Sequence, residues 1–106
     1  KAPKGRVVID RGAVEALKKR GKSLLPSGIK DVGGNFARGD SILILDDNKR
    51  EIAVGMTNYS SEEVKKILGL KSSEIEFALG YKDDDEVIHR DNLVITEGIT
   101  EGDLRC

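Results

Sequence analysis

Gly21-Lys22-Ser23-Leu24-Leu25-Pro26-Ser27-Gly28-Ile29 (GKSLLPSGI) begins like the end of a phosphate-binding loop but does not continue as one. A phosphate loop reads G-x-x-x-x-G-K-[ST] between a strand and a helix, because its backbone N–H groups and the helix N-terminus point at one anion. The first glycine would fall at Ala16, and Pro26 with Gly28 prevents a regular helix from starting at Ser23. We therefore interpret the segment as a turn that its leucines anchor to the core, with backbone N–H groups and Lys22 facing an anion.

Length and composition indicate one small domain. The chain has 106 residues, of which 38% are hydrophobic, which suffices for one modest core. It has no run of 18 apolar residues and no secretory signal, so we expect a soluble cytoplasmic protein without a membrane partner. Because it starts at Lys1 without methionine and leads directly into a strand pattern, we expect it to be a fragment of a longer protein. The only cysteine, Cys106, is expected to be an exposed tail residue.

Charge is divided unevenly along the chain. Residues 1–30 contain nine Lys and Arg against Asp10 and Glu15, a net +7, so the remaining 76 residues carry −8 and the whole chain −1. A basic segment on an acidic protein predicts a polyanion-binding face or a charged contact with a missing domain, although a plain solvated surface explains it as well.

The first half of the chain predicts strands around one helix. Asp10 is expected to cap a helix over residues 12–20, and Gly21 to end it. The two glycines of Gly33-Gly34 mark a bulge or a close backbone approach. Residues 41–45 are continuously apolar, which predicts burial on both faces of the sheet. Strands are predicted over 6–10, 30–36, 41–45 and 51–56, with a hairpin turn at 46–49.

The second half predicts two short helices and a final strand region. Ser60 with Glu63, and Ser73 with Glu76, each match a capping box. One or two strands are expected over residues 87–95, followed by a polar tail, 96–106. The pattern predicts an α+β, mainly β fold, a mixed pseudo-barrel of five or six short strands with small helices at its rim. The predicted core comprises Val8, Ile9, Ala13, Leu17, Ile42, Ile44, Ile52, Val54, Leu68, Phe77 and Val94.

No group of residues forms a catalytic set. Asp83-Asp84-Asp85-Glu86 lacks the alternating carboxylates and turn glycine of a calcium loop, so it is interpreted as a solvated loop. His89, the only histidine, has no partner serine or cysteine in a nucleophile motif and is expected at a strand edge. The four aromatic residues are too few and too dispersed for a stacking platform of a sheet-type RNA reader. We therefore predict no catalytic residues and no metal site.

Several motifs together resemble the PUA domain family. They are Asp10-x-Gly12-Ala13-x-x-Ala16-Leu17, GKSLLPSGI, Gly34-x-Phe36-x-Arg38-Gly39-Asp40, residues 55–61, Leu79-Gly80-Tyr81 and residues 87–93. Within that family the chain is most similar to the PUA domain at the C-terminus of bacterial glutamate 5-kinases. The resemblance implies a PUA domain over residues 1–95, with the tail 96–106 outside it.

The resemblance also implies a site and partners. In RNA-binding relatives the first helix, the glycine-rich stretch after it and the neighbouring strand edge hold RNA. Carried onto this chain, the surface comprises Lys18, Lys19, Lys22, Ser23, Leu24, Leu25, Pro26, Ser27 and Gly28. The family of kinases phosphorylates glutamate with ATP and magnesium in the first step of proline synthesis and is feedback-inhibited by proline. The sites for both belong to an amino-acid kinase domain that is absent here. The resemblance therefore implies no cofactor in this fragment, a kinase domain as its partner in a homo-oligomeric parent, and regulation or RNA binding as its role.

Overall fold

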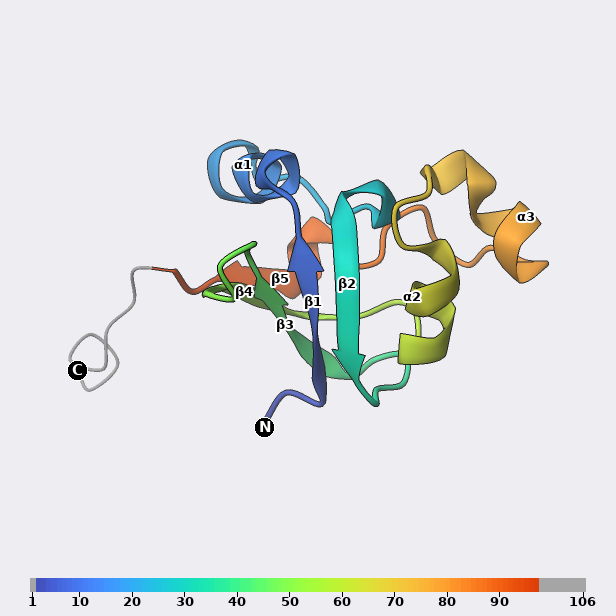
Figure 1. Ribbon diagram of the computed structural model, residues 1–106, viewed down its shortest axis with the longest axis horizontal. Coiled ribbons are helices and arrows are strands. Elements are labelled where there is room, and N and C mark those ends of the chain that lie inside the picture. Colours follow the sequence, from blue (N-terminus) through green and yellow to red (C-terminus); the bar gives the residue numbers. More distant parts are fainter. Residues whose placement is uncertain (1, 98–106) are drawn as a thin grey trace.

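The computed structural model describes residues 2–97, which form a five-stranded mixed sheet with short helices (Figure 1). The sheet order is β2-β1-β3-β4-β5; β1 and β3 are parallel, and the other pairs are antiparallel. The strands are β1 (Gly5–Ile9), β2 (Ile29–Gly34), β3 (Ser41–Leu45), β4 (Glu51–Met56) and β5 (Leu93–Ile95). The α-helices are α1 (Arg11–Arg20), α2 (Ser61–Ile67) and α3 (Ile75–Leu79), and 3₁₀ turns span Pro26–Gly28, Ser72–Glu74 and Arg90–Asn92. The predicted fold class is confirmed.

The first helix begins and ends as its sequence predicts. The Asp10 carboxylate accepts a hydrogen bond from the backbone N–H of Ala13 at 2.8 Å. Gly21 adopts the left-handed conformation, with φ of 60°, and its N–H donates to the carbonyl of Ala16. In Figure 1, α1 covers one end of the sheet, α2 lies beside β2, and α3 lies on the far side of α2. This arrangement leaves the segment after α1 at the surface, between the helix and the last part of the chain.

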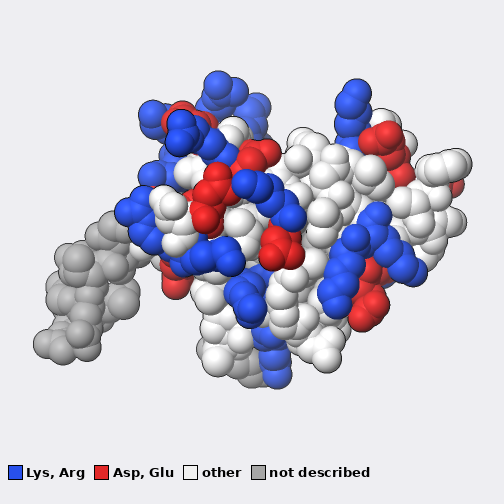
Figure 2. Space-filling view, in the orientation of Figure 1, with Lys and Arg blue, Asp and Glu red and all other residues white. Residues whose placement is uncertain are grey.

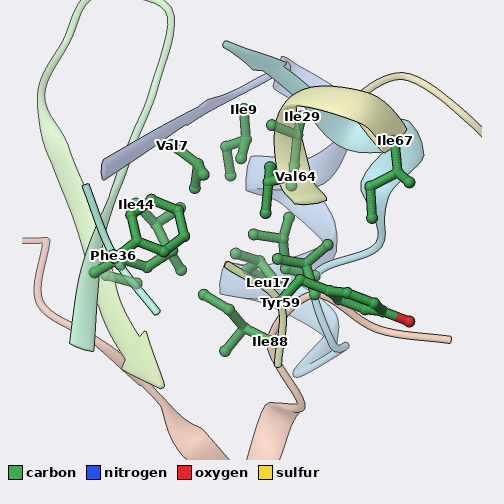
Figure 3. Packing of buried hydrophobic residues seen from close by; sticks show 14 of the residues in the cluster. Val7, Ile9, Leu17, Ile29, Phe36, Ile44, Tyr59, Val64, Ile67 and Ile88 are labelled. Atoms are coloured by element: carbon green, nitrogen blue, oxygen red, sulfur yellow. The ribbon is translucent and has the colours of Figure 1, made fainter. Parts of the chain in front are cut away.

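The core lies between the inner face of the sheet, α1 and α2 (Figure 3). Residues Val8, Ile9, Leu17, Ile42, Ile44 and Ile52 are buried as predicted, and Ala13, Val54 and Leu68 are half-buried. Three core predictions are wrong: Phe77 is 97% exposed on α3, Val94 is 60% exposed on β5, and half-buried Val54 on β4 pairs with Val94 on the outer face of the sheet. The core prediction missed several fully buried residues, namely Tyr59, Val64, Ile67, Ile75, Val87 and Ile88, whereas Leu24 is buried, as its predicted anchoring role requires.

Other local predictions also need correction. The extra residue in β2 is Lys30, because Ile9 pairs with Ile29 and Val8 with Asp31. Of the two predicted roles for the glycine pair, the close backbone approach is confirmed: a Cβ added at Gly34 would lie 2.7 Å from the Cα of Gly5. Leu43 is half-buried, so β3 is not buried on both faces.

Of the two capping boxes predicted in the second half of the chain, one is confirmed and one is wrong. The box of Ser60 and Glu63 is present at α2, but α3 starts two residues after Ser73 and has no side-chain cap hydrogen bond at its N-terminus. The predicted strand region over 87–95 contains only β5 and an isolated bridge between Leu24 and Ile88, because Arg90–Asn92 form a 3₁₀ turn. Most of the predicted tail, including Cys106, lies outside the described residues.

Candidate functional site

A groove of about 600 Å³ opens between the start of α1 and two loop segments, residues 22–28 and 86–90. Its apolar lining comes from both sides, from Ala13 and Ala16 on the helix and from Leu24 and Leu25 on the loop. Its polar and charged lining residues are Asp10, Lys22, Ser23, Ser27, Glu86, His89 and Arg90. The groove thus combines apolar contact area with hydroxyls and charges of both signs.

The loop side of the groove is fixed by a few buried residues. Leu24 is 1% exposed, and its N–H donates to the carbonyl of Ile88 at 2.9 Å while its own carbonyl accepts from Val87 at 2.8 Å. Pro26 is buried, and a Cβ added at Gly28 would lie 2.7 Å from the Cβ of Ala13. The absence of a side chain at Gly28 is therefore what lets the loop pack directly against α1.

The second loop, residues 86–90, is tied to the first. The backbone N–H of Arg90 donates to Ser23 Oγ at 2.8 Å. His89 Nδ1 accepts the N–H of Asp91 at 3.1 Å, so the histidine caps a 3₁₀ turn rather than standing at a strand edge as predicted. Hydrogen bonds between segments far apart in sequence hold the groove in one shape. A preformed groove favours binding, because little has to be ordered when a ligand enters.

The electrostatics of the groove are mixed. Lys22 and Arg90 bring positive charge, while Asp10 and Glu86 bring negative charge. Figure 2 shows lysines and arginines over the end of the molecule that carries α1, with carboxylates between them. The basic segment that the sequence indicates is therefore an interrupted basic surface, and not a continuous one.

The sequence matches a known domain family and several known proteins. The model described as "PUA domain" matches residues 5–79. The chain belongs to the PUA domain family. A glutamate 5-kinase of Thermus thermophilus is 53% identical over 95 residues, 90% of this chain and 26% of that protein. A glutamate 5-kinase of Thermoanaerobacter sp. is 58% identical over 93 residues, 88% of this chain and 25% of that protein.

Two solved structures share the PUA fold. A PUA domain of Aeropyrum pernix in complex with tartrate has a TM-score of 0.59 and 25% identity, covering 81% of this chain and 41% of that one. A chain in a Cbf5-Nop10-Gar1 complex has a TM-score of 0.53 and 28% identity, covering 57% of this chain and 18% of that one. The PUA domain described here spans about a quarter of the length of the glutamate 5-kinases that it matches.

The PUA domain brings together six of the nine predicted site residues, Lys22 to Leu25, Ser27 and Gly28, along the groove. Pro26 is buried behind them. Only one of the two leucines anchors the loop, because Leu25 is 43% exposed. Lys18 forms an ion pair with Glu97 and lines a smaller hollow of about 230 Å³ between α1 and the β3–β4 turn. Lys19 stands 3.5 Å from Glu15 and is largely exposed, so the two helix lysines lie outside the groove.

Sequence reasoning missed the residues that the last loop contributes to the groove. They are Glu86, His89 and Arg90. The only available signal was a polar His-Arg-Asp-Asn run inside an apolar segment, which breaks the pattern of a strand. The pairing of Leu24 with Ile88 positions these residues, and it cannot be predicted from the local sequence.

A second polar cluster of the PUA domain surrounds Glu63. Arg38 Nε donates to Glu63 Oε1 at 3.0 Å, and Arg38 Nη2 and the Tyr81 hydroxyl donate to Oε2. The guanidinium also pairs with Asp83 and lies 5.6 Å from the centroid of the Tyr81 ring. The hydrogen bond from Arg38 lowers the pKa of Glu63 to about 2, and those from Tyr81 and the Ser60 N–H act in the same direction against burial. The cluster joins three segments of the rim.

The acidic residues Asp83, Asp84 and Asp85 are exposed. Asp83 and Asp85 are each paired, with Arg38 and Lys82 respectively. Among residues 2–97, no group of three or more His, Cys, Asp or Glu side chains could hold a metal ion. Within the same residues, no helix has both the length and the apolar character needed to cross a membrane.

Proposed function

We propose that the chain is the C-terminal PUA module of a glutamate 5-kinase and that it acts as a regulatory and assembly module. The observation that carries the proposal is the identity of 53–58% to the kinases over nearly the whole chain, combined with coverage of only about a quarter of their length. The neighbour solved within a Cbf5-Nop10-Gar1 complex supports it, because that chain belongs to an assembly of several proteins.

The reaction itself belongs to the other three quarters of such a protein. Phosphoryl transfer from ATP to glutamate needs a phosphate cradle and a magnesium site. The described residues form neither: GKSLLPSGI folds as a loop and a 3₁₀ turn, and its Lys22 lies at the rim of an open groove. We therefore assign ATP, magnesium and catalysis to the kinase domain of a cytoplasmic homo-oligomer, and expect no glutamate kinase activity from these 106 residues.

The test compares a kinase with and without its PUA region. The Thermus thermophilus kinase is assayed for ATP-dependent glutamyl phosphate formation over a range of magnesium and proline concentrations, in three forms: whole, truncated, and truncated with the 106-residue chain added. We expect truncation to change the response to magnesium or proline and the added chain to restore it in part. Identical responses of the whole and truncated enzymes would contradict a regulatory role.

RNA binding is the second candidate, and the open groove is the observation that favours it. Leu25 and the two alanines of α1 offer an apolar surface for an unstacked base, while Lys22 and Arg90 stand where a phosphate backbone would pass. Because carboxylates interrupt the basic surface, we expect the binding to be weak and without sequence preference.

Salt dependence and charge reversal test the RNA candidate. With about three or four phosphates contacted, log K should fall with log salt at a slope of roughly −2 to −3.5. Changing Lys19 and Lys22 together to glutamate should abolish binding of a structured RNA at low salt. The matched control is the same change at Lys65 and Lys66, which are exposed on α2. Equal binding by the wild-type chain and the Lys19/Lys22 variant would rule this candidate out.

A further inference from the structure

The outer face of the sheet carries a row of apolar side chains that no other part of residues 2–97 covers fully. Strand pairing aligns Leu43 on β3 with Val54 on β4, and Val54 with Val94 on β5. Alternation along β4 adds Met56 to the same face, opposite Ala53 in the core. We call these four residues the outer row. Val94 is 60% exposed, Met56 is 47% exposed, and the other two are half-buried.

An outer row of this composition is unusual for a sheet face in water. A mixed or antiparallel sheet with one solvated face normally alternates apolar residues inside with polar residues outside. Here two valines form a cross-strand pair on the outside, leucine extends the patch onto β3, and methionine extends it along β4. A contiguous exposed apolar patch, unlike a single exposed residue, indicates an interaction surface.

The position of the outer row indicates what covers it. The Lys4 N–H donates to the carbonyl of Ser41 at 2.9 Å, and Ser41 pairs with Met56. The first described residues of the chain therefore lie next to one end of the row. In the glutamate 5-kinases that match this chain, roughly three quarters of the protein lies outside the match. A domain joined ahead of Lys1 would lie within reach of the outer row.

We propose that the outer row is the surface through which this PUA module docks on the kinase domain of the longer protein, an inference that rests on the proposed function. The complementary surface is apolar and carries a carboxylate at its edge. We expect this carboxylate on the partner because Arg6, which continues the row on β1 opposite Leu43, is exposed. Arg6 has no carboxylate partner among residues 2–97. The groove beside α1 lies elsewhere on the module and stays open for its own ligand.

The experiment measures binding in trans. The Thermus thermophilus kinase lacking its PUA region is titrated with the 106-residue chain by calorimetry. A chain with Val54→Thr and Val94→Ser keeps the shape of the sheet but makes the row polar. We expect about a tenfold or greater loss of affinity, as for the central residues of an interface. The matched control is Phe77→Ser, which removes a more exposed apolar side chain from α3, away from the row.

The outcomes separate the docking surface from the proposed function. Tight binding by the wild-type chain and the Phe77→Ser variant, with weak binding by the Val54/Val94 variant and unchanged thermal unfolding, supports the docking surface. Equal binding by all three chains, or no binding by the wild-type chain, overturns it. If the chain binds through the row but leaves the magnesium and proline responses unchanged, the regulatory function fails and the docking surface stands. If the responses are restored equally by the Val54/Val94 variant, the function stands and the docking surface fails.

Discussion

Helices α2 and α3 start from nearly the same sequence but are held in very different ways. Ser60-Ser61-Glu62-Glu63 starts α2, where Ser60 Oγ accepts the N–H of Glu63 at 3.2 Å and Glu63 Oε1 accepts that of Ser60 at 2.7 Å. Before α3 the similar run 72–76 makes another contact: Glu74 Oε1 accepts the N–H of Lys71 at 2.8 Å. The predicted cap residue, Ser73, lies inside a 3₁₀ turn.

Tertiary contacts explain the difference. Helix α2 buries Ser61, Glu63, Val64 and Ile67, whereas α3 buries only Ile75. Glu63 also receives hydrogen bonds from Arg38 and Tyr81, which come from segments on either side of α2 in the sequence. A capping motif thus predicts where a helix can start, and the surrounding structure decides whether it starts there.

The largest difference in stability between variants of the two helices is expected for substitutions of their glutamates. Glu63→Ala leaves the N–H of Ser60 and the guanidinium of Arg38 without their acceptor, so we expect a loss of about 3 kcal/mol in the free energy of unfolding. Glu76→Ala on α3 should change it by less than about 0.5 kcal/mol, because Glu76 is exposed. Urea denaturation measures both. The neighbouring Glu62→Ala is the control on α2, since that side chain is 76% exposed.

Acid should weaken the attachment of α2 in a characteristic pH range. The pKa of Glu63 is about 2 in the folded chain, against 4.5 for an ordinary glutamate. A carboxyl with a lowered folded pKa contributes stability that is fully present above the unfolded pKa and is lost as the pH falls through the folded pKa. Stability from Glu63 should therefore disappear between about pH 4.5 and pH 2. Urea midpoints measured across this range should fall more steeply for the wild-type chain than for Glu63→Gln; parallel curves would contradict the assignment.

Truncating an apolar residue should also cost more stability on α2 than on α3. Val64 on α2 is fully buried, so Val64→Ala should cost about 2 kcal/mol through lost contacts and a small cavity. Phe77→Ala removes a larger side chain from α3 but should be nearly neutral, because Phe77 is 97% exposed. Thermal unfolding of both variants provides the measurement. A large loss for Phe77→Ala would mean that the Phe77 side chain itself packs against the body of the domain in solution.

The sequence predicted most of the sheet and the first helix because their signals are local. Asp10 and Gly21 set the ends of α1, and the apolar runs of β1 and β3 correctly predicted that Ile9, Ile42 and Ile44 are buried. The errors arose where burial depends on distant elements. Val94 looked like a core residue from its neighbours, but its strand pairs with β4 in a register that turns it outward.

The candidate site was predicted on one side only. The loop 22–28 could be identified from its glycine and proline residues and from the family resemblance. Its partner loop, residues 86–90, could not, because it reaches the groove through the pairing of Leu24 with Ile88 and the contact of Ser23 with Arg90. Contacts across more than 60 residues are set by the sheet topology, and a single sequence does not reveal that topology.

The smallest expected difference concerns the two cap serines. Ser60→Ala removes the acceptor for the N–H of Glu63 and should cost about 1 kcal/mol, or about 4–8 °C in Tm for a domain of this size. Ser73→Ala should leave the Tm unchanged, because the Ser73 side chain makes no hydrogen bond within the described part of the chain and α3 begins after it. The same substitution in the same sequence motif would then have two outcomes, set by the position of the motif in the fold. A drop in Tm for Ser73→Ala equal to that for Ser60→Ala would show that the second capping box forms in solution.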